Sequence, residues 1–285
     1  MHAAMEFANA EPAACQKWYK NSNSVIVLAA EDDRKLFELS RRLRKKGLNT
    51  VEFYEPDIGY ELTAIAIEPG PLTKRLCSGL RLAGKREHPE AKALLSKKFD
   101  AIDAMRSCCQ SAGQNMLQHG ESVHAHLKDL IGVLQGQEGA FQWRLPEWTT
   151  QYSSQLLERL PDPYTLQQYA IWHDCGKPLT RTQDEEGKVH YPEHAKASAE
   201  LFRSLYPGRE DVARLIEMDM DMHRLKSPEI EEFSQRKEAP TLLLSALAEV
   251  HSNAAMFGGV GSDSCKIKLK HLEKKGMAVC RKIFG

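Results

Sequence analysis

The chain has 285 residues, which at roughly 150 residues per domain suggests about two domains. Hydrophobic residues make up 42% and charged residues 27%, a balance typical of globular proteins that excludes collagen-like and low-complexity classes. The 39 lysines and arginines balance the 39 aspartates and glutamates, so the net charge does not favour nucleic acid or a membrane as partner.

Cysteine usage and hydropathy indicate where such a chain resides. The seven cysteines form no CxxC pair, which argues against a disulfide framework and against a Cys-based zinc site. No apolar run approaches the ~20 residues that span a bilayer, and residues 1–14 lack the pattern of a signal peptide. We therefore expect a cytoplasmic protein without membrane contact.

Residues 1–84 predict a small α/β domain. The apolar run 25–30 predicts a strand, and Asp32 is a suitable N-cap for a helix that ends at Gly47. Two further strands are expected over 50–54 and 62–67, before the Pro-Gly-Pro sequence at 69–71 breaks the chain.

The remainder of the chain predicts helices only. Residues 85–112 are polar and basic at their start, and we expect them to form a basic helical connector. Residues 113–285 show successive helical periods separated by proline and glycine, with no convincing strand, which predicts an all-α domain. The expected fold class is therefore α+β, a small α/β domain followed by an all-α domain.

Five of the predicted helices carry a metal-binding type of side chain on the apolar stripe, where positions i, i+3, i+4 and i+7 share a face. These residues are His119, His173, Asp174, His194, His223 and Glu249. His223 is expected on one continuous helix with Val212. Burying several unpaired polar groups costs about 1–3 kcal/mol each, so they need a shared partner. Imidazole and carboxylate ligands suit one or two divalent ions, with Mn, Fe, Zn, Mg, Ni and Co left open.

The order of these residues resembles the HD-domain metalloenzymes. The string His-Asp-Cys-Gly-Lys-Pro at 173–178, flanked by His119, His194 and His223, carries the resemblance over roughly residues 115–257. The resemblance implies an all-α phosphohydrolase or phosphodiesterase that acts on a nucleotide or RNA phosphoester. By this likeness Asp174 orients the ions as a catalytic residue, and Lys177 meets the substrate phosphate.

The predicted site departs from that family at its last helix. The family closes its site with an aspartate there, whereas Glu249 is the carboxylate on a plausible inward face of this chain. Asp219 and Asp221 are fallback carboxylates, and Cys175 is expected to be a packing residue. Two alternative functions would place a metal in the same helices: a di-iron oxygenase, and an RNA-binding protein with a structural metal.

Residues 1–84 resemble the type 2 peptidyl-tRNA hydrolases. The likeness rests on the strings at 25–30, 55–59 and 62–70, and it implies a three-layer α/β module with Asp57 and Thr63 beside its active site. That family's first strand and its glycine-lysine turn have no counterpart here. The resemblance therefore implies either a gene product that begins upstream or an inactive binding remnant, and metal-independent peptidyl-tRNA hydrolysis stays an alternative function.

Basic residues gather in two segments although the net charge is zero. They are Lys74, Arg75, Arg81, Lys85, Arg86, Lys92, Lys97 and Lys98 near the expected domain junction, and Lys266, Lys268, Lys270, Lys274, Lys275, Arg281 and Lys282 near the C-terminus. A polyanion such as tRNA could bind across them, with an affinity that falls as salt rises. Solvated helix faces are the alternative explanation.

Overall fold

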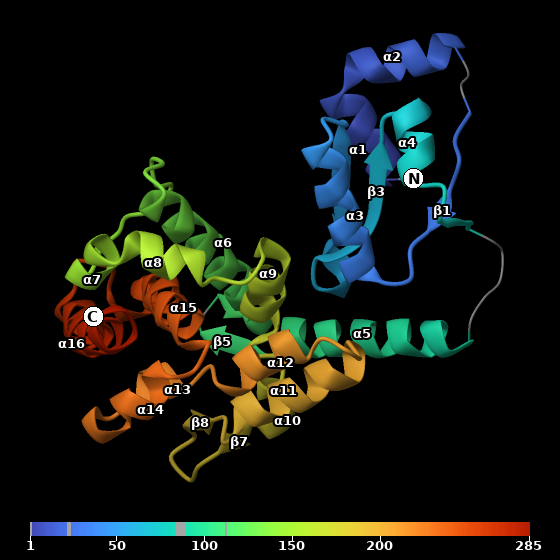
Figure 1. Ribbon diagram of the computed structural model, residues 1–285. Helices are drawn as coiled ribbons and strands as arrows, with labels where there is room; N and C mark the ends of the chain where they lie inside the picture. Colours follow the sequence, from blue (N-terminus) through green and yellow to red (C-terminus); the bar gives the residue numbers. More distant parts are fainter. Residues whose placement is uncertain (1, 22–23, 84–88, 112) are drawn as a thin grey trace. The chain divides into compact units, whose positions relative to one another are not determined.

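The computed structural model describes residues 2–21, 24–83, 89–111 and 113–285 (Figure 1). They belong to two compact units, Met1–Phe99 and Asp100–Gly285, and helix α5 (Pro89–Ser107) runs across the division. The expected boundary lies at 84–89, and residues 84–88 of it are outside the described residues. No helix of the described chain combines the length and apolar character needed to cross a bilayer.

The first unit contains short helices and two separate two-stranded antiparallel sheets, β1–β4 and β2–β3. Its elements before α5 are α1 (His2–Ala10), α2 (Pro12–Asn21), β1 (Leu28–Ala29), α3 (Asp33–Lys45), β2 (Thr50–Glu55), η1 (Pro56–Ile58), β3 (Glu61–Ile67), α4 (Pro71–Leu76) and β4 (Arg81–Leu82). Helices α1 and α3 both pack against the β2–β3 hairpin. The core of the unit is built on Leu39, Leu43, Leu48 and Cys77, which are buried together.

The predicted helix of this unit and the two predicted strands that follow it are confirmed. Asp32 caps α3 by accepting a hydrogen bond from the Lys35 amide at 2.6 Å, as its position before the apolar period predicts. Gly47 follows the helix with φ of 74°, a left-handed conformation that glycine adopts without strain. Strands β2 and β3 pair with Thr50 opposite Ile67, and their bounds lie within a residue of the expected ones.

The strand predicted over Val25–Ala30 is largely wrong. Only Leu28 and Ala29 pair, with β4, and residues 24–27 are not in a strand. Val25, Ile26 and Val27 are 69%, 72% and 62% exposed, so this apolar run lacks the burial that a central strand receives. β-propensity reports how well a side chain fits a half-buried surface, and no such surface covers this run within the described residues.

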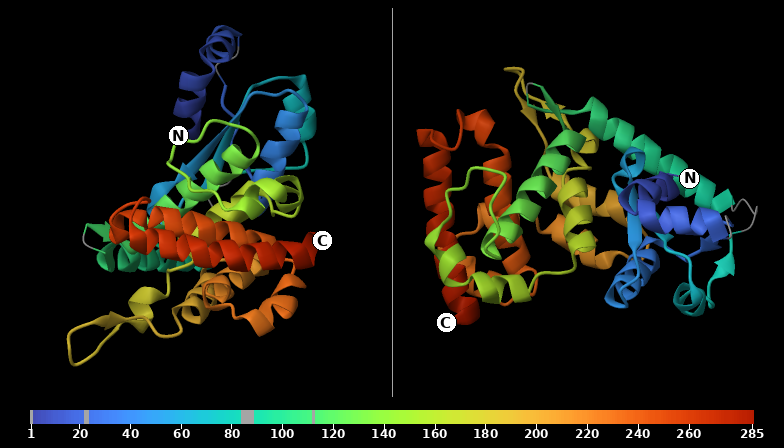
Figure 2. Two further views of the ribbon diagram at one scale, coloured as in Figure 1. Left: turned by 90° about the vertical axis from the view of Figure 1, so that its left-hand side faces the viewer. Right: turned by 90° about the horizontal axis from the view of Figure 1, so that it is seen from above.

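The second unit is mostly helical and is organised around α6 (Met116–Leu134), which packs against both α9 and α15 (Figure 1). Its longer helices are α9 (Pro163–Trp172), α11 (His194–Leu205), α12 (Glu210–Glu217), α15 (Ala239–Ser252) and α16 (Asp263–Phe284). Its short helices are α7 (Glu147–Gln151), α8 (Ser153–Glu158), α10 (Lys177–Thr180), α13 (Asp221–Arg224), η2 (Ser227–Glu229), α14 (Ile230–Ser234) and η3 (Ala254–Phe257). Helix α16, red in Figure 2, lies beside α15.

Two expectations for this unit need correction. It is not free of strands, because two short antiparallel pairs occur: β5 (Cys109–Ser111) with β6 (Gln114–Asn115), and β7 (Thr182–Gln183) with β8 (Val189–His190). The helix expected to carry both Val212 and His223 is divided, since α12 ends at Glu217 and α13 begins at Asp221. Two- and three-residue strands are too short to show a period of two in the sequence.

Gly120 allows α6 and α9 to approach each other closely. A Cβ at Gly120 would lie 2.4 Å from the carbonyl oxygen of Ile171, far inside van der Waals contact with a backbone atom. Only glycine fits this position, which brings the first turn of α6 against the last turn of α9.

Asp129 on α6 holds the segment between α6 and α7. Its carboxylate accepts hydrogen bonds from the Ala140 amide at 2.7 Å, the Phe141 amide at 3.2 Å and the Trp143 indole at 2.8 Å. These bonds together hold the pKa of Asp129 below its usual value, although partial burial acts in the opposite direction. An ionised side chain on α6 therefore helps to order a segment without secondary structure of its own.

Candidate metal centre

The N-terminal end of α6 positions His119. Asn115 forms a capping box with Gln118: its side chain accepts from the Gln118 amide at 2.9 Å, and the Gln118 side chain accepts from the Asn115 amide at 3.1 Å. The helix therefore begins at Met116, and His119 falls in its first turn with its side chain fully buried.

The C-terminal end of α9 positions His173 and Asp174. Asp162 caps the start of this helix, and His173 is its C-cap residue, with Gly176 and Pro178 following shortly after. Nδ1 of His173 lies 2.8 Å from the carbonyl oxygen of Ala170. Because a carbonyl oxygen only accepts, Nδ1 carries the proton and Nε2 faces the Asp174 carboxylate, 3.3 Å away.

A close contact between the 173–178 segment and α11 brings His194 to the same place. A Cβ at Gly176 would lie 2.3 Å from the Ser198 amide nitrogen, and the Gly176 amide donates to the Ser198 hydroxyl at 2.8 Å. His194, at the start of α11, has Nδ1 2.8 Å from the Tyr191 carbonyl oxygen. Its Nε2 lies 3.6 Å from Oδ1 of Asp174.

Asp174 is thus the point where three segments meet. Nε2 of His119 lies 3.6 Å and Nε2 of His173 lies 3.3 Å from its Oδ2, while His194 faces its other oxygen. One ligand atom from each of His119, His173 and Asp174 lies within 4.8 Å of the others, a spacing that a metal ion could bridge.

A second His–carboxylate pair adjoins this group. Nε2 of His223 lies 2.8 Å from Oε2 of Glu249, and the other oxygen of Glu249 is 3.9 Å from Nε2 of His119. The two fallback carboxylates differ. Asp219 is buried and accepts from the Tyr169 hydroxyl at 2.6 Å, whereas Asp221 pairs with Arg236 at 2.5 Å.

The buried imidazoles fit a metal ion. Neither nitrogen of His119, nor Nε2 of His173, has a hydrogen-bond partner or solvent contact among the described residues. Leaving such groups unsatisfied costs about 1–3 kcal/mol each. A divalent ion would satisfy Nε2 of His119 and Nε2 of His173, and the backbone bond at Nδ1 of His173 is the kind of contact that orients a metal-binding imidazole.

Burial and neighbouring charges set the protonation states. Burial and the adjacent His173 lower the pKa of His119 to about 4. Burial opposes a charge on His173, yet the carboxylates of Asp174 and Asp219 outweigh it and raise its pKa to about 10, so a metal ion bound at Nε2 would displace a proton. Burial would raise the pKa of Asp174, but His173 and Lys177 hold it well below its usual range.

The same balance applies to the second pair. Burial would raise the pKa of Glu249, but the hydrogen bond from His223 and the surrounding imidazoles lower it to about 2. Both Glu249 and Asp174 are therefore carboxylates at neutral pH, as ligation of a hard cation requires.

Lys177 lies beside this centre, at the start of α10. Its Nζ lies 2.6 Å from Oδ2 of Asp174 and 3.0 Å from Oε1 of Gln110, and 5.6 Å from the centre of the Tyr191 ring. Sequence reasoning did not identify Gln110 or Tyr191. Neither lies on a helical stripe, and Gln110 reaches the site through a two-strand hairpin that has no sequence signature.

Cys175 occupies a packing position. It is buried, its thiol donates to the Ser198 carbonyl oxygen at 3.4 Å, and burial raises its pKa, which disfavours the nucleophilic thiolate. The packing role expected for this cysteine fits these contacts.

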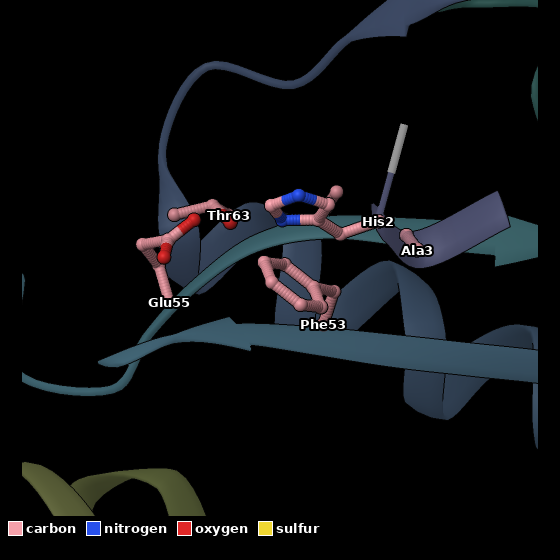
Figure 3. A pocket seen from close by; sticks show the side chains of 6 residues that line it. His2, Ala3, Phe53, Glu55 and Thr63 are labelled. Carbon is pink, nitrogen blue, oxygen red and sulfur yellow. The ribbon is translucent and has the colours of Figure 1, made fainter. Parts of the chain in front are cut away.

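The two residues singled out in the first unit lie in different elements. Thr63 on β3 lines a small pocket with His2, Phe53 and Glu55, in which the His2 ring packs edge-on against Phe53 (Figure 3). Asp57 lies in η1 and does not line this pocket.

Several cations of the predicted basic segments have local partners. Lys266 pairs with Asp263 at 3.0 Å, Lys282 with Glu231 at 2.5 Å, and Lys275 donates to the His223 carbonyl oxygen at 2.9 Å. The side chains of Lys85, Arg86 and Lys92 are outside the described residues.

Part of the second unit is similar to a known protein family. Residues 146–251 match the HD domain. The matched segment includes His173, Asp174, His194, His223 and Glu249, whereas His119 precedes it. HD domains are generally metal-dependent phosphohydrolases, which agrees with the cluster of His119, His173 and Asp174.

Neither the curated proteins nor the solved structures contain a match to this chain. The HD-domain match does not extend into residues 1–84, so the resemblance of that segment to peptidyl-tRNA hydrolases has no support from these comparisons.

Proposed function

We propose that the second unit is a metal-dependent hydrolase of a nucleotide or RNA phosphoester. The observation that carries this proposal is the convergence of buried imidazole nitrogens without hydrogen-bond partners on one buried carboxylate, Asp174. The HD-domain match of residues 146–251 points to the same chemistry.

The ligand assignment follows the distances. His119, His173 and Asp174 would hold the first ion, since their donor atoms lie within 4.8 Å of one another. His194 faces the other oxygen of Asp174, so it would complete this position or begin a second one. His223 and Glu249 would supply the remaining donor atoms. Glu249 stands where the family has an aspartate, and its lowered pKa keeps it ionised, as a carboxylate ligand must be.

The chemistry divides between the ion and the chain. A bound divalent ion would polarise a phosphoryl oxygen and activate water for in-line attack on phosphorus. Asp174 would help to hold the ion and would also accept a hydrogen bond from Lys177. The ammonium group of Lys177 would stabilise the negative charge that develops on the phosphoryl oxygens.

Hydrolysis of generic phosphoesters tests this proposal. We would assay bis(p-nitrophenyl) phosphate and p-nitrophenyl phosphate with protein reconstituted in Mn²⁺, Fe²⁺ or Zn²⁺, comparing the wild type with Asp174→Asn. We expect Asp174→Asn to lose turnover by more than about 100-fold, because a metal ligand contributes at least as much as the groups that orient it.

Asp184→Asn is the matched control, since Asp184 also contacts a histidine, His190 at 2.6 Å, but in the exposed β7–β8 hairpin. Turnover in Asp174→Asn equal to that of Asp184→Asn would contradict the proposal.

A further inference from the structure

The ammonium group of Lys177 is held by two acceptors from different segments. Its side chain is only 11% exposed. Of its three N–H groups, one meets Oδ2 of Asp174 and one meets Oε1 of Gln110, while the Tyr191 ring lies on a further side. These contacts leave the third N–H for a substrate oxygen.

The hairpin that carries Gln110 is fixed at both sides. The Met116 amide donates to the Cys108 carbonyl oxygen at 2.9 Å, which joins the hairpin to the start of α6. The Tyr191 hydroxyl donates to the Cys109 carbonyl oxygen at 3.1 Å, which joins it to the segment before α11. Gln110 therefore has a defined position relative to both Lys177 and the His119 end of α6.

The two acceptors of Lys177 are not equivalent. Oδ2 of Asp174 is also the carboxylate oxygen nearest to Nε2 of His119 and of His173, so an ion bound there would share the oxygen that Lys177 uses. The charge of the ion would weaken the hold of Asp174 on the ammonium group. Gln110 is neutral and lies outside that ligand set, so it would retain Lys177 without repelling a phosphate.

We propose that Gln110 is a positioning residue of this site, supported by Tyr191, which holds Lys177 in place for an anionic oxygen of the substrate. This inference rests on the proposed function, because it assumes a phosphate bound beside the ion. It assigns the β5–β6 hairpin, which precedes the HD-domain match, to the substrate side of the site.

Gln110→Met tests the proposal, because methionine has nearly the same length as glutamine but no strong acceptor. The control is Gln114→Met in the same hairpin, since the Gln114 amide contacts the Gln118 carbonyl oxygen and not Lys177. We would measure the affinity of inorganic phosphate for metal-loaded protein by calorimetry, KM and kcat for bis(p-nitrophenyl) phosphate, and bound metal.

We expect Gln110→Met to bind phosphate about tenfold more weakly and to raise KM similarly, with bound metal unchanged, since a hydrogen bond to a charged group is lost. Gln114→Met should match the wild type. In a Lys177→Met background, Gln110→Met should have no further effect, because the two residues act as one unit.

The outcomes separate this inference from the function on which it rests. A wild type that binds neither metal nor phosphate contradicts the proposed function. A wild type that binds both, with unchanged phosphate affinity in Gln110→Met, contradicts the positioning role alone. A loss of bound metal in Gln110→Met also overturns that role. So does a loss of phosphate affinity that is as large in the Lys177→Met background as in the wild type.

Discussion

Most side chains of the candidate site lie close to the two carboxylate oxygens of Asp174. Three imidazoles and one ammonium group lie within 3.6 Å of its carboxylate, and the carboxylate itself is 2% exposed. A buried carboxylate with this many cationic or potentially ligating neighbours keeps its negative charge although burial opposes it.

At the level of single residues, Asp129 gives a prediction that does not depend on metal. Asp129→Ala removes three hydrogen bonds to residues 140–143, and we expect a loss of about 2 kcal/mol in the free energy of unfolding at pH 7. Chemical denaturation measures this loss. Glu138→Ala, an exposed change nearby, should stay within about 0.5 kcal/mol of the wild type.

The effect of Asp129 should also depend on pH. Because its pKa is lower in the folded protein than in the unfolded chain, its contribution is fully present above the unfolded value of about 3.9 and falls as pH decreases through the folded value. The stability difference between wild type and Asp129→Ala should therefore shrink at pH 3. A difference that is constant from pH 7 to pH 3 would contradict this account.

The sequence indicated the candidate ligand side chains better than the groups around them. His119 and His194 were expected on apolar stripes, and both are buried there, because a helical period determines which face turns inward. Gln110 and Tyr191 could not be predicted in the same way. Their contacts with Lys177 depend on tertiary packing between segments that are 67 and 14 residues away in the sequence, so no local pattern marks them.

At the level of elements, the contact between α6 and α9 sets the distance between His119 and His173. Gly120→Ala places a methyl group 2.4 Å from the Ile171 carbonyl oxygen, so the two helices must separate. Overpacking typically destabilises a protein by about 1–3 kcal/mol. Alanine has a higher helix propensity than glycine, which offsets up to about 1 kcal/mol of this loss. We expect a net loss of about 1–2 kcal/mol in unfolding experiments, together with weaker metal binding.

Gly261→Ala is the control for this change, because a Cβ at Gly261 meets no atom within 4 Å. Its stability should equal that of the wild type. Equal stability in Gly120→Ala would show that α6 and α9 do not approach as closely as described.

Element prediction succeeded where capping and periodicity agreed. Asp32 and Gly47 delimit α3 by local chemistry, which acts regardless of the rest of the fold. The run Val25–Val27 has equally strong local signals, but a strand also needs a partner and a buried face, which its neighbours do not supply in the described chain. The break between α12 and α13 likewise depends on packing rather than on a proline or glycine.

At the level of the whole molecule, metal binding should be confined to the second unit. All the candidate ligands lie in Asp100–Gly285. An ion at about 100 times its Kd stabilises the unit that binds it by about 2.7 kcal/mol. In hydrogen-exchange mass spectrometry, added metal should slow exchange in peptides from α6 and α9, and leave peptides from residues 24–83 unchanged. Metal-dependent protection in residues 24–83 would contradict this assignment.

The most direct test of the central claim is the metal content of the purified protein. We would reconstitute untagged wild type, His119→Ala and His124→Ala with Mn²⁺, Fe²⁺ or Zn²⁺, remove free metal, and measure bound metal by elemental mass spectrometry. His124 lies on α6 with His119 but outside its apolar stripe, which makes it the matched control. The account predicts stoichiometric metal in wild type and His124→Ala and its loss in His119→Ala; a folded wild type that retains no metal would contradict it.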